Sequence, residues 1–119
     1  MKRGLKFIGI FILGILLGCL VCSLIKRPTK VTINFVNKSS QKILSAKIYQ
    51  KKNILLAENI ERGESANVIM YVPSETGYSC IVTFANGSTV NHTEYYIEPG
   101  YKITENIYDT KIEPVLDNF

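Results

Sequence analysis

His92 is the only histidine in the chain, so it is the first residue to consider for metal binding or acid–base chemistry. Glu94 follows it at i, i+2, which places both side chains on one face of a regular strand. Such a pair can contribute to a metal site, but a structural zinc takes four ligands. No group of Cys, His and Asp residues supplies the rest. We therefore expect an exposed strand histidine, with no metal and no cofactor.

Cys80 lies in the stretch GYSCIVTFANG, residues 77–87. The other cysteines, Cys19 and Cys22, belong to an N-terminal apolar segment and cannot easily reach it. A reactive thiol needs a lowered pKa and a neighbouring base, and the chain offers a single histidine. We expect Cys80 to be a small buried side chain on the inner face of a strand. A disulfide between two chains is the alternative.

The acidic residues show no pattern typical of catalysis. Three of them flank a turn and are expected to be solvated: Glu58, Glu61 and Glu64. Four lie near the C-terminus and are expected to form a charged edge that blocks strand pairing, with weak cation binding as the alternative: Glu105, Asp109, Glu113 and Asp117. The chain contains no G-x-S-x-G, Walker loop or GxGxxG motif. Although a triad can assemble from distant positions, we predict no catalytic residues and no enzyme.

The basic charge of the chain is concentrated at its N-terminus. Residues 1–28 hold five of the 14 Lys and Arg residues and no acid, whereas residues 29–119 hold nine basic and ten acidic residues. Nucleic-acid binding needs a basic patch on the folded unit. The composition therefore argues against a nucleic-acid partner, and it divides the chain into an appendage, 1–28, and a domain, 29–119.

The appendage has the features of a membrane anchor. Residues 7–25 carry no charge, and basic residues flank them on both sides. A helix of this length nearly matches a bilayer core of about 30 Å. Pro28 cannot continue such a helix. We predict one transmembrane helix over residues 7–25, with membrane lipid as its partner.

Two other readings of the appendage remain open. A cleaved secretory signal would have a shorter apolar region and a small-residue cleavage site. A bacterial lipoprotein signal is suggested by Gly18 and Cys19, because Cys19 would then be lipidated. Leu17 is bulkier than is common there, and the segment stays apolar through Ile25.

The appendage also carries a possible helix contact. Gly14, Gly18 and Cys22 lie at i, i+4 and i+8, a small-residue pattern that lets two membrane helices approach closely. It predicts a homodimer, although glycines are common in membrane helices without such a role. The very short N-terminal tail favours an extracytoplasmic domain. The Lys-, Ile- and Asn-rich composition suggests a bacterial inner membrane with the domain in the periplasm.

From Lys30 onward the apolar residues repeat with period two, which indicates strands rather than helices. The expected inward sets are Val31, Ile33 and Phe35; Leu44, Ala46 and Ile48; Ala66, Val68, Met70 and Val72; and Tyr78, Cys80, Val82 and Phe84. Asn86-Gly87 predicts a type I′ hairpin turn. The C-terminal IEPVLDNF contains Pro114 and is expected to be irregular. About seven short strands result, which is typical of an antiparallel sandwich.

Two passages give the domain a resemblance. NIERGES, residues 59–65, and VPSETGYSCIVTF, residues 72–84, resemble the turn and strand passages of small bacterial extracytoplasmic immunoglobulin-like modules. The chain departs from antibody-type domains, because it has no Trp, no second Cys in the domain, and its Tyr-x-Cys in about the fifth strand. The resemblance implies a seven-stranded antiparallel immunoglobulin-like sandwich, which would follow the transmembrane helix.

Four tyrosines gather in the last two expected strands: Tyr95, Tyr96, Tyr101 and Tyr108. Tyrosine is enriched at recognition surfaces because it offers a large rigid contact area and a polar tip. It is also a favoured strand residue, and about half of these would then pack inward. The tyrosines predict a binding face on this sheet.

Together these features favour a membrane-anchored, extracytoplasmic binding module without catalytic activity. Its expected partner is an envelope protein or another envelope component. Two alternatives remain: a small envelope inhibitor or immunity-type protein, and an accessory subunit that binds a membrane complex through its helix.

Overall fold

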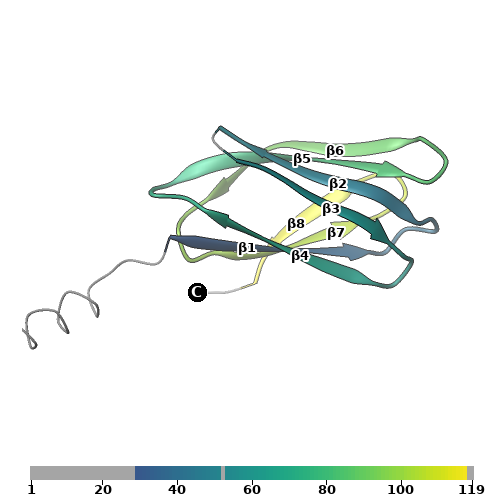
Figure 1. The fold of residues 1–119 in the computed structure, drawn as a ribbon, viewed down its shortest axis with the longest axis horizontal. Helices are drawn as coiled ribbons and strands as arrows, with labels where there is room; N and C mark the ends of the chain where they lie inside the picture. The colour runs from purple at the N-terminus through teal and green to yellow at the C-terminus, as the bar shows by residue number, and fades with distance from the viewer. Residues whose placement is uncertain (1–28, 52, 118–119) are drawn as a thin grey trace, which may run out of the picture.

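The computed structural model describes residues 29–51 and 53–117, and all regular structure in this part of the chain is β-strand. Figure 1 shows the strands in two layers. Their bounds are β1 Lys30–Asn37, β2 Ile43–Gln50, β3 Asn53–Ile60, β4 Ser65–Tyr71, β5 Thr76–Phe84, β6 Thr89–Ile97, β7 Lys102–Ile107 and β8 Ile112–Leu116.

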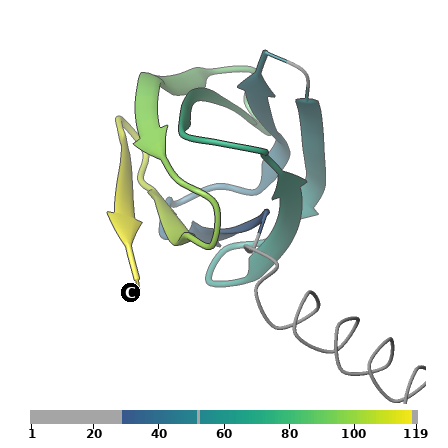
Figure 2. The same ribbon diagram turned by 90° about the vertical axis from the view of Figure 1, so that its left-hand side faces the viewer.

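The strands form two four-stranded sheets, with the orders β4-β1-β7-β8 and β3-β2-β5-β6. Neighbouring strands are antiparallel except β1 and β7, which are parallel. The two sheets also approach each other at their edges, where β3 contacts β4 and β6 contacts β8. The end-on view in Figure 2 shows the strands surrounding a common interior, with β8 (yellow) at one margin.

The core lies between the sheets and follows the expected alternation in most strands. Val31, Ile33 and Phe35 of β1 are fully buried, and so are Val82 and Phe84 of β5. Alternate side chains of a strand point to opposite faces, so one apolar row from each strand meets in the middle. The period-two pattern therefore predicted most of the core correctly.

The expected fold class is wrong in two respects within the described residues. The structure has eight strands rather than seven, because residues 112–116 form β8. The sandwich is not wholly antiparallel, because β1 and β7 are parallel. Pro114 made this tail look irregular, yet β8 is the last strand of its sheet. A proline is tolerated there because an edge strand has no neighbour to satisfy on one side.

The helical part of the expected fold class is not seen either. Residues 7–25, with Gly14, Gly18, Cys19 and Cys22, lie outside the described residues. In residues 29–51 and 53–117 there is no helix at all. None of the described residues accordingly belongs to a helix long and apolar enough to span a bilayer.

Two local expectations fail because the backbone departs from regular geometry. The register of β2 against β5 shifts between Ile43 and Ser45. Ile43 is therefore buried, while Leu44, expected to face inward, is 42% exposed. At the β5–β6 turn only Gly87 has a positive φ, 86°, whereas a type I′ turn needs two such residues. The amide of Gly87 donates to the Phe84 carbonyl, 2.9 Å, as in a type I turn that ends in a left-handed glycine.

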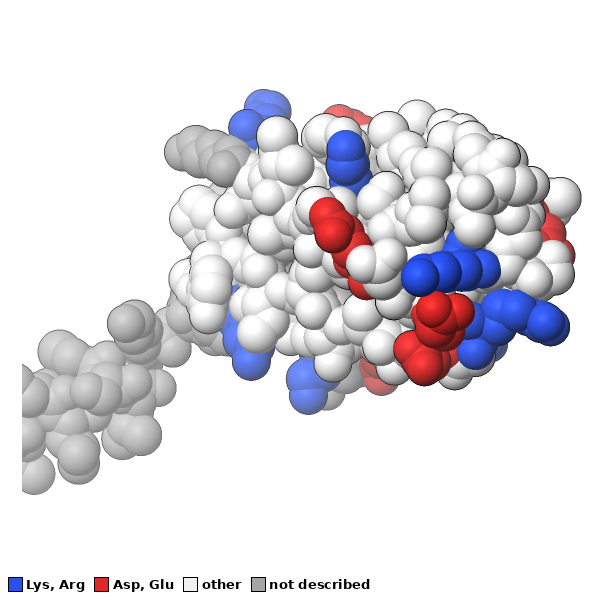
Figure 3. All heavy atoms as spheres, turned by 45° about the vertical axis from the view of Figure 1, so that its right-hand side comes forward, with Lys and Arg blue, Asp and Glu red and all other residues white. Residues whose placement is uncertain are grey.

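One end of the molecule collects charged side chains. It carries the β1–β2, β3–β4 and β7–β8 connections, and it holds the ion pairs Lys42–Glu61, 3.3 Å, and Lys111–Glu113, 2.7 Å. Figure 3 shows basic and acidic groups interspersed at this end, next to a largely uncharged surface. Both ion pairs are exposed, and exposed pairs contribute little to stability.

Candidate functional site

Glu105 is the most unusual residue of the core. It stands in β7 between Ile103 and Ile107, and all three side chains are buried. The alternation of β7 therefore directs a carboxyl group into the position where an aliphatic side chain is expected. Burial of a carboxylate is costly unless other groups hydrogen-bond to it.

Two side chains from the opposite sheet contact the same oxygen of Glu105. The hydroxyl of Tyr78, on β5, donates a hydrogen bond to Oε1. The Nε2 atom of His92, on β6, lies 2.8 Å from Oε1. The other oxygen, Oε2, is buried and has no hydrogen-bond partner among the described residues. One oxygen of the carboxyl group therefore has two hydrogen-bond partners, and the other has none among the described residues.

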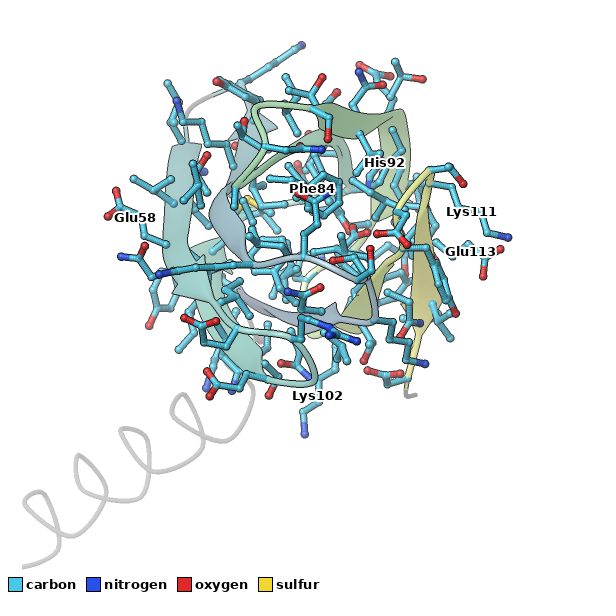
Figure 4. The ribbon with its side chains drawn as sticks, turned by 90° about the vertical axis from the view of Figure 1, so that its right-hand side faces the viewer. Glu58, Phe84, His92, Lys102, Lys111 and Glu113 are labelled. Atoms are coloured by element: carbon cyan, nitrogen blue, oxygen red, sulfur yellow. The ribbon has the colours of Figure 1, made fainter. Side chains whose placement is uncertain are left out.

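His92 connects this buried group to the surface. Its side chain is 13% exposed, and Figure 4 shows it between β6 and β8, while Lys111 and Glu113 project outward. Its Nδ1 lies 3.2 Å from the Thr93 carbonyl. Because a carbonyl only accepts, we assign a proton to Nδ1. Burial lowers the pKa of His92, but the hydrogen bond and charge of Glu105 outweigh it, so the pKa is raised.

Cys80 completes the group. It pairs directly with His92 across β5 and β6, so both side chains point inward. Cys80 Sγ, an imidazole nitrogen of His92 and a carboxylate oxygen of Glu105 all lie within 4.8 Å of one another. We call Tyr78, Cys80, His92 and Glu105 the Glu105 cluster. Its members come from β5, β6 and β7, and therefore from both sheets.

The Cys80 thiol does not have the properties of a nucleophile. It is fully buried and forms no disulfide. Burial raises the pKa of Cys80, and the nearby charge of Glu105 raises it further. A nucleophilic cysteine needs the opposite shift together with access to a substrate. The prediction of a small buried side chain on the inner strand face is confirmed.

Aromatic rings enclose the cluster on the β5–β6 side. The Tyr78 ring packs edge-to-face against His92, with centroids 5.5 Å apart, and against Tyr95, with centroids 5.9 Å apart. Such contacts fix ring orientations as well as burying apolar area. The pKa of Tyr78 is strongly raised, first by burial and then by the charge of Glu105. Its hydroxyl therefore stays protonated and remains a donor to the carboxyl group.

The expectation that His92 and Glu94 lie on one face of the strand is wrong. The expectation that His92 is exposed is wrong as well. Tyr78 pairs with Tyr95 and Cys80 with His92, so β6 holds one extra residue between these pairs. Such a bulge reverses the facing of the residues beyond it. Tyr95 takes the inward position instead of Glu94, which is exposed. The bulge has no clear signal in the sequence.

Glu105 was expected at a charged edge with three other acidic residues, and that expectation is also wrong. Asp109, Glu113 and Asp117 are exposed, whereas Glu105 is buried. A signal was available, because Glu105 sits at the inward position of an I-x-E-x-I pattern. Glu58, Glu61 and Glu64 are exposed, as expected.

The structure brings three of the four predicted tyrosines toward one end of the domain. Tyr95 points inward and Tyr96 outward, where its hydroxyl lies 2.5 Å from both Glu75 and Glu98. Tyr101 packs partly against the core. Hydrogen bonds with these two carboxylates raise the pKa of Tyr96.

Tyr108 stands apart from the other tyrosines. It follows β7, whereas Tyr101 precedes it, so the whole strand separates them. The ammonium groups of Lys38 and Lys111 lie 6.0 and 5.4 Å from its ring centroid. The four tyrosines therefore do not share one face, and their role in binding stays a prediction.

The outer surface of the sheet β3-β2-β5-β6 has the opposite character to the cluster. Lys47 of β2 stands between Leu56 of β3 and Ile81 of β5. One pair further along, Tyr49 stands beside Ile54, which is 72% exposed. These exposed apolar side chains are neighbours on one sheet face. We call Tyr49, Ile54, Leu56 and Ile81 the outer face.

A hollow adjoins the outer face at the start of β5. It has a volume of about 330 Å³, and Tyr49, Lys51, Glu75, Gly77 and Glu94 line it. Gly77 contributes no side chain to the sheet surface there, and the Glu94 side chain lies 3.7 Å from the place that a β-carbon of residue 77 would take. The hollow combines an aromatic ring with two carboxylates and one ammonium group, so its charge is slightly negative.

Comparison with known proteins supports the fold alone. No family model matches the chain, and no curated protein matches it. It is similar to a solved structure described as the NMR structure of the protein from Eubacterium rectale, with a TM-score of 0.58. The two share 8% sequence identity over 76% of this chain and 91% of the other. The Glu105 cluster and the outer face are therefore inferred from the residues of this chain alone and not from a similar protein.

Proposed function

We propose that this chain is a non-catalytic binding module that contacts a protein partner through its outer face. The observation that carries the proposal is the placement of exposed apolar side chains on adjacent strands of one sheet face. Single exposed apolar residues are normal on protein surfaces. Neighbouring ones that form a patch are typical of interaction sites.

The chemistry of this surface suggests what the partner presents. Ile54 and Leu56 belong to β3, and their exposed side chains point away from the core, so a partner can approach them from above the sheet face. The hollow beside Tyr49 adds the carboxylates of Glu75 and Glu94. A complementary protein surface would offer apolar side chains for the outer face and a Lys or Arg for the hollow. Charge complementarity would set orientation more than affinity.

The location proposed for the module rests on the sequence. Residues 7–25 are apolar and flanked by basic residues, a composition that favours attachment to lipid. We place the domain on the extracytoplasmic side of a bacterial membrane, with an envelope protein as partner. Alkaline extraction of membranes that contain the full chain tests it separately from the binding surface.

Site-specific photo-crosslinking tests the binding surface. A photoreactive amino acid replaces Leu56 in one full-length variant and Ile69 in another. These positions are similarly exposed, 47% and 43%, but Ile69 lies on β4 of the other sheet. We expect the Leu56 variant to form one discrete crosslinked species in the source cells and the Ile69 variant to form none. Equal crosslinking from both positions, or none from Leu56, would overturn the proposal.

Charge substitution is a second, independent test of the outer face as the binding surface. Leu56→Lys places an ammonium group in the proposed interface, and Ile69→Lys is the matched control on the other sheet. In these variants the photoreactive amino acid stands at position 81, which is also exposed on the outer face. We expect Leu56→Lys to lose the crosslinked species formed from position 81, whereas Ile69→Lys keeps it. Circular dichroism establishes that both variants are folded. Retention of the crosslink in folded Leu56→Lys would argue against the outer face as the interface.

A further inference from the structure

We propose that Cys80, His92 and Glu105 bind a divalent transition-metal ion of the zinc class. Thiolate, imidazole and carboxylate are the three protein ligands that Zn²⁺ uses. Here one of each comes from β5, β6 and β7, with the ligand atoms within 4.8 Å of one another. The site faces the interior, so it is independent of the outer face and of the proposed binding function.

The unsatisfied oxygen of Glu105 is the second observation that points to a ligand. Oε1 already accepts the Tyr78 hydroxyl, while Oε2 is buried without a partner in the described part of the chain. Buried polar atoms without partners are rare in folded proteins, and a bound cation is one explanation for such an atom. A cation would satisfy Oε2 while Tyr78 holds the carboxylate in place, as outer-shell groups do in metal sites.

His92 is oriented as a metal ligand. Its Nδ1–H donates to the Thr93 carbonyl, so Nε2 of the neutral ring carries a lone pair. That lone pair points at the Glu105 carboxylate, 2.8 Å away. Two acceptors repel each other unless a proton or a cation lies between them. The same pocket therefore takes either an imidazolium proton or a metal ion.

Binding of a metal ion at this site would require only small changes in the structure. Tetrahedral bonds of about 2.0–2.3 Å need ligand atoms roughly 3.3–3.8 Å apart, so the side chains must shift by about an ångström. The partly exposed edge of His92 provides access between β6 and β8. When the metal binds, the Cys80 S–H bond breaks, its proton passes to water, and sulfur donates its electron pair to the ion. Three protein ligands leave the fourth position to water.

Cobalt titration of the full-length chain tests the site. The parent protein carries Cys19→Ser and Cys22→Ser, so that Cys80 is the remaining thiol. After treatment with a chelator it is titrated with Co²⁺, and thiolate-to-cobalt charge transfer is recorded. We expect a saturable band that Zn²⁺ displaces. A parent protein that shows no such band would overturn the proposal.

Substitutions then assign the ligands. We expect Cys80→Ser to abolish the band and Glu105→Gln to weaken Zn²⁺ binding at least about tenfold. Glu94→Gln is the matched control, because Glu94 lies two residues from His92 on the same strand but is exposed. Unchanged Zn²⁺ affinity in folded Glu105→Gln, or equal losses in Glu94→Gln and Glu105→Gln, would contradict the assignment.

If Glu105→Gln does not fold, X-ray absorption spectroscopy identifies the zinc ligands without a substitution in the cluster. The spectrum is recorded on the zinc-loaded parent protein, which has no substitution in the cluster. We expect one sulfur scatterer together with nitrogen and oxygen scatterers. A zinc shell of nitrogen and oxygen alone would show that Cys80 is not a ligand and would overturn the proposed site.

Discussion

Each side of the sheet β3-β2-β5-β6 departs locally from the usual distribution of polar and apolar residues. On its inner side His92 faces the buried carboxyl group of Glu105, where aliphatic packing is expected. On its outer side Ile54 and Leu56 face solvent, where polar residues are expected. A sequence that specifies a fold satisfies its binary pattern nearly everywhere, and departures concentrate at functional sites. The two departures differ in cost, because only the inner one sacrifices core packing.

That difference predicts which substitutions will destabilise the domain. Inside the core, a lost partner leaves another polar group buried and unsatisfied, so the effects are large. On the outer face, water replaces whatever is removed, so stability changes little while recognition changes.

Glu105→Ala should cause the greatest loss of stability. It removes the partner of His92 and the acceptor of the Tyr78 hydroxyl, and it leaves space in the core. Breaking a buried ion pair by deleting one partner typically costs about 3–5 kcal/mol. Urea denaturation of the metal-free protein measures the change. Glu94→Ala is the control and should stay within about 0.5 kcal/mol of wild type. Equal stabilities of the two variants would mean that the inner departure has no structural cost.

Tyr78→Phe should have an intermediate effect. It keeps the ring contacts with His92 and Tyr95 but removes the hydroxyl that donates to Glu105. Loss of a hydrogen bond to a charged group costs about 1.5–3 kcal/mol. The control is Tyr96→Phe, which removes an exposed hydroxyl that contacts Glu75 and Glu98. We expect little change in stability there, because the hydroxyl is exposed to water. A larger loss in Tyr96→Phe than in Tyr78→Phe would reverse the comparison.

The stability of the domain should fall as pH rises through the neutral range. Glu105 raises the pKa of His92 in the folded state. A raised folded pKa means that the folded chain binds the proton more tightly than the unfolded chain. The resulting stabilisation is complete below the unfolded pKa of about 6.5 and is lost as pH rises through the folded pKa.

Unfolding free energies measured with a chelator present, from about pH 6 to 8, test this dependence. The interval stays below the usual pKa of a cysteine thiol, about 8.5, so titration of Cys80 in the unfolded chain adds little. His92→Gln should flatten the profile. If wild type and His92→Gln share one pH dependence, His92 is not its source.

Ile54→Thr should have the smallest effect on stability. The side chain is largely exposed, and threonine keeps the β-branching that strands favour. We expect a change within about 0.5 kcal/mol by urea denaturation, together with weaker crosslinking from position 81. A loss above about 2 kcal/mol would show that Ile54 packs against the domain itself rather than awaiting a partner.

Local patterns predicted the β-domain well wherever the backbone is regular. Val31, Ile33 and Phe35 were assigned to the core by alternation alone, and they are buried. Cys80 was assigned correctly for the same reason. The predictions failed where one extra residue changes the phase, as at Leu44, or where a proline hides an edge strand, as in β8.

The Glu105 cluster shows the limit of such reasoning. Period two within β6 suggested Glu94 as the neighbour of His92, and only the bulge opposite β5 reverses that choice. The true neighbour lies 13 residues away in sequence and on the other sheet. No local pattern encodes a contact across a sandwich, because that contact depends on how two sheets are stacked.

The amino-acid sequence alone therefore indicated most of the strands and, for most of their residues, which side chains point inward, because alternation is a property of a single strand. It also placed an acid between two isoleucines in β7. The contact of this acid with His92, Tyr78 and Cys80 follows instead from the packing of the two sheets, because it brings together strands whose order along the chain does not indicate their contacts. The stacking of the sheets turned four scattered residues into one buried site, and it left the apolar outer face exposed to solvent.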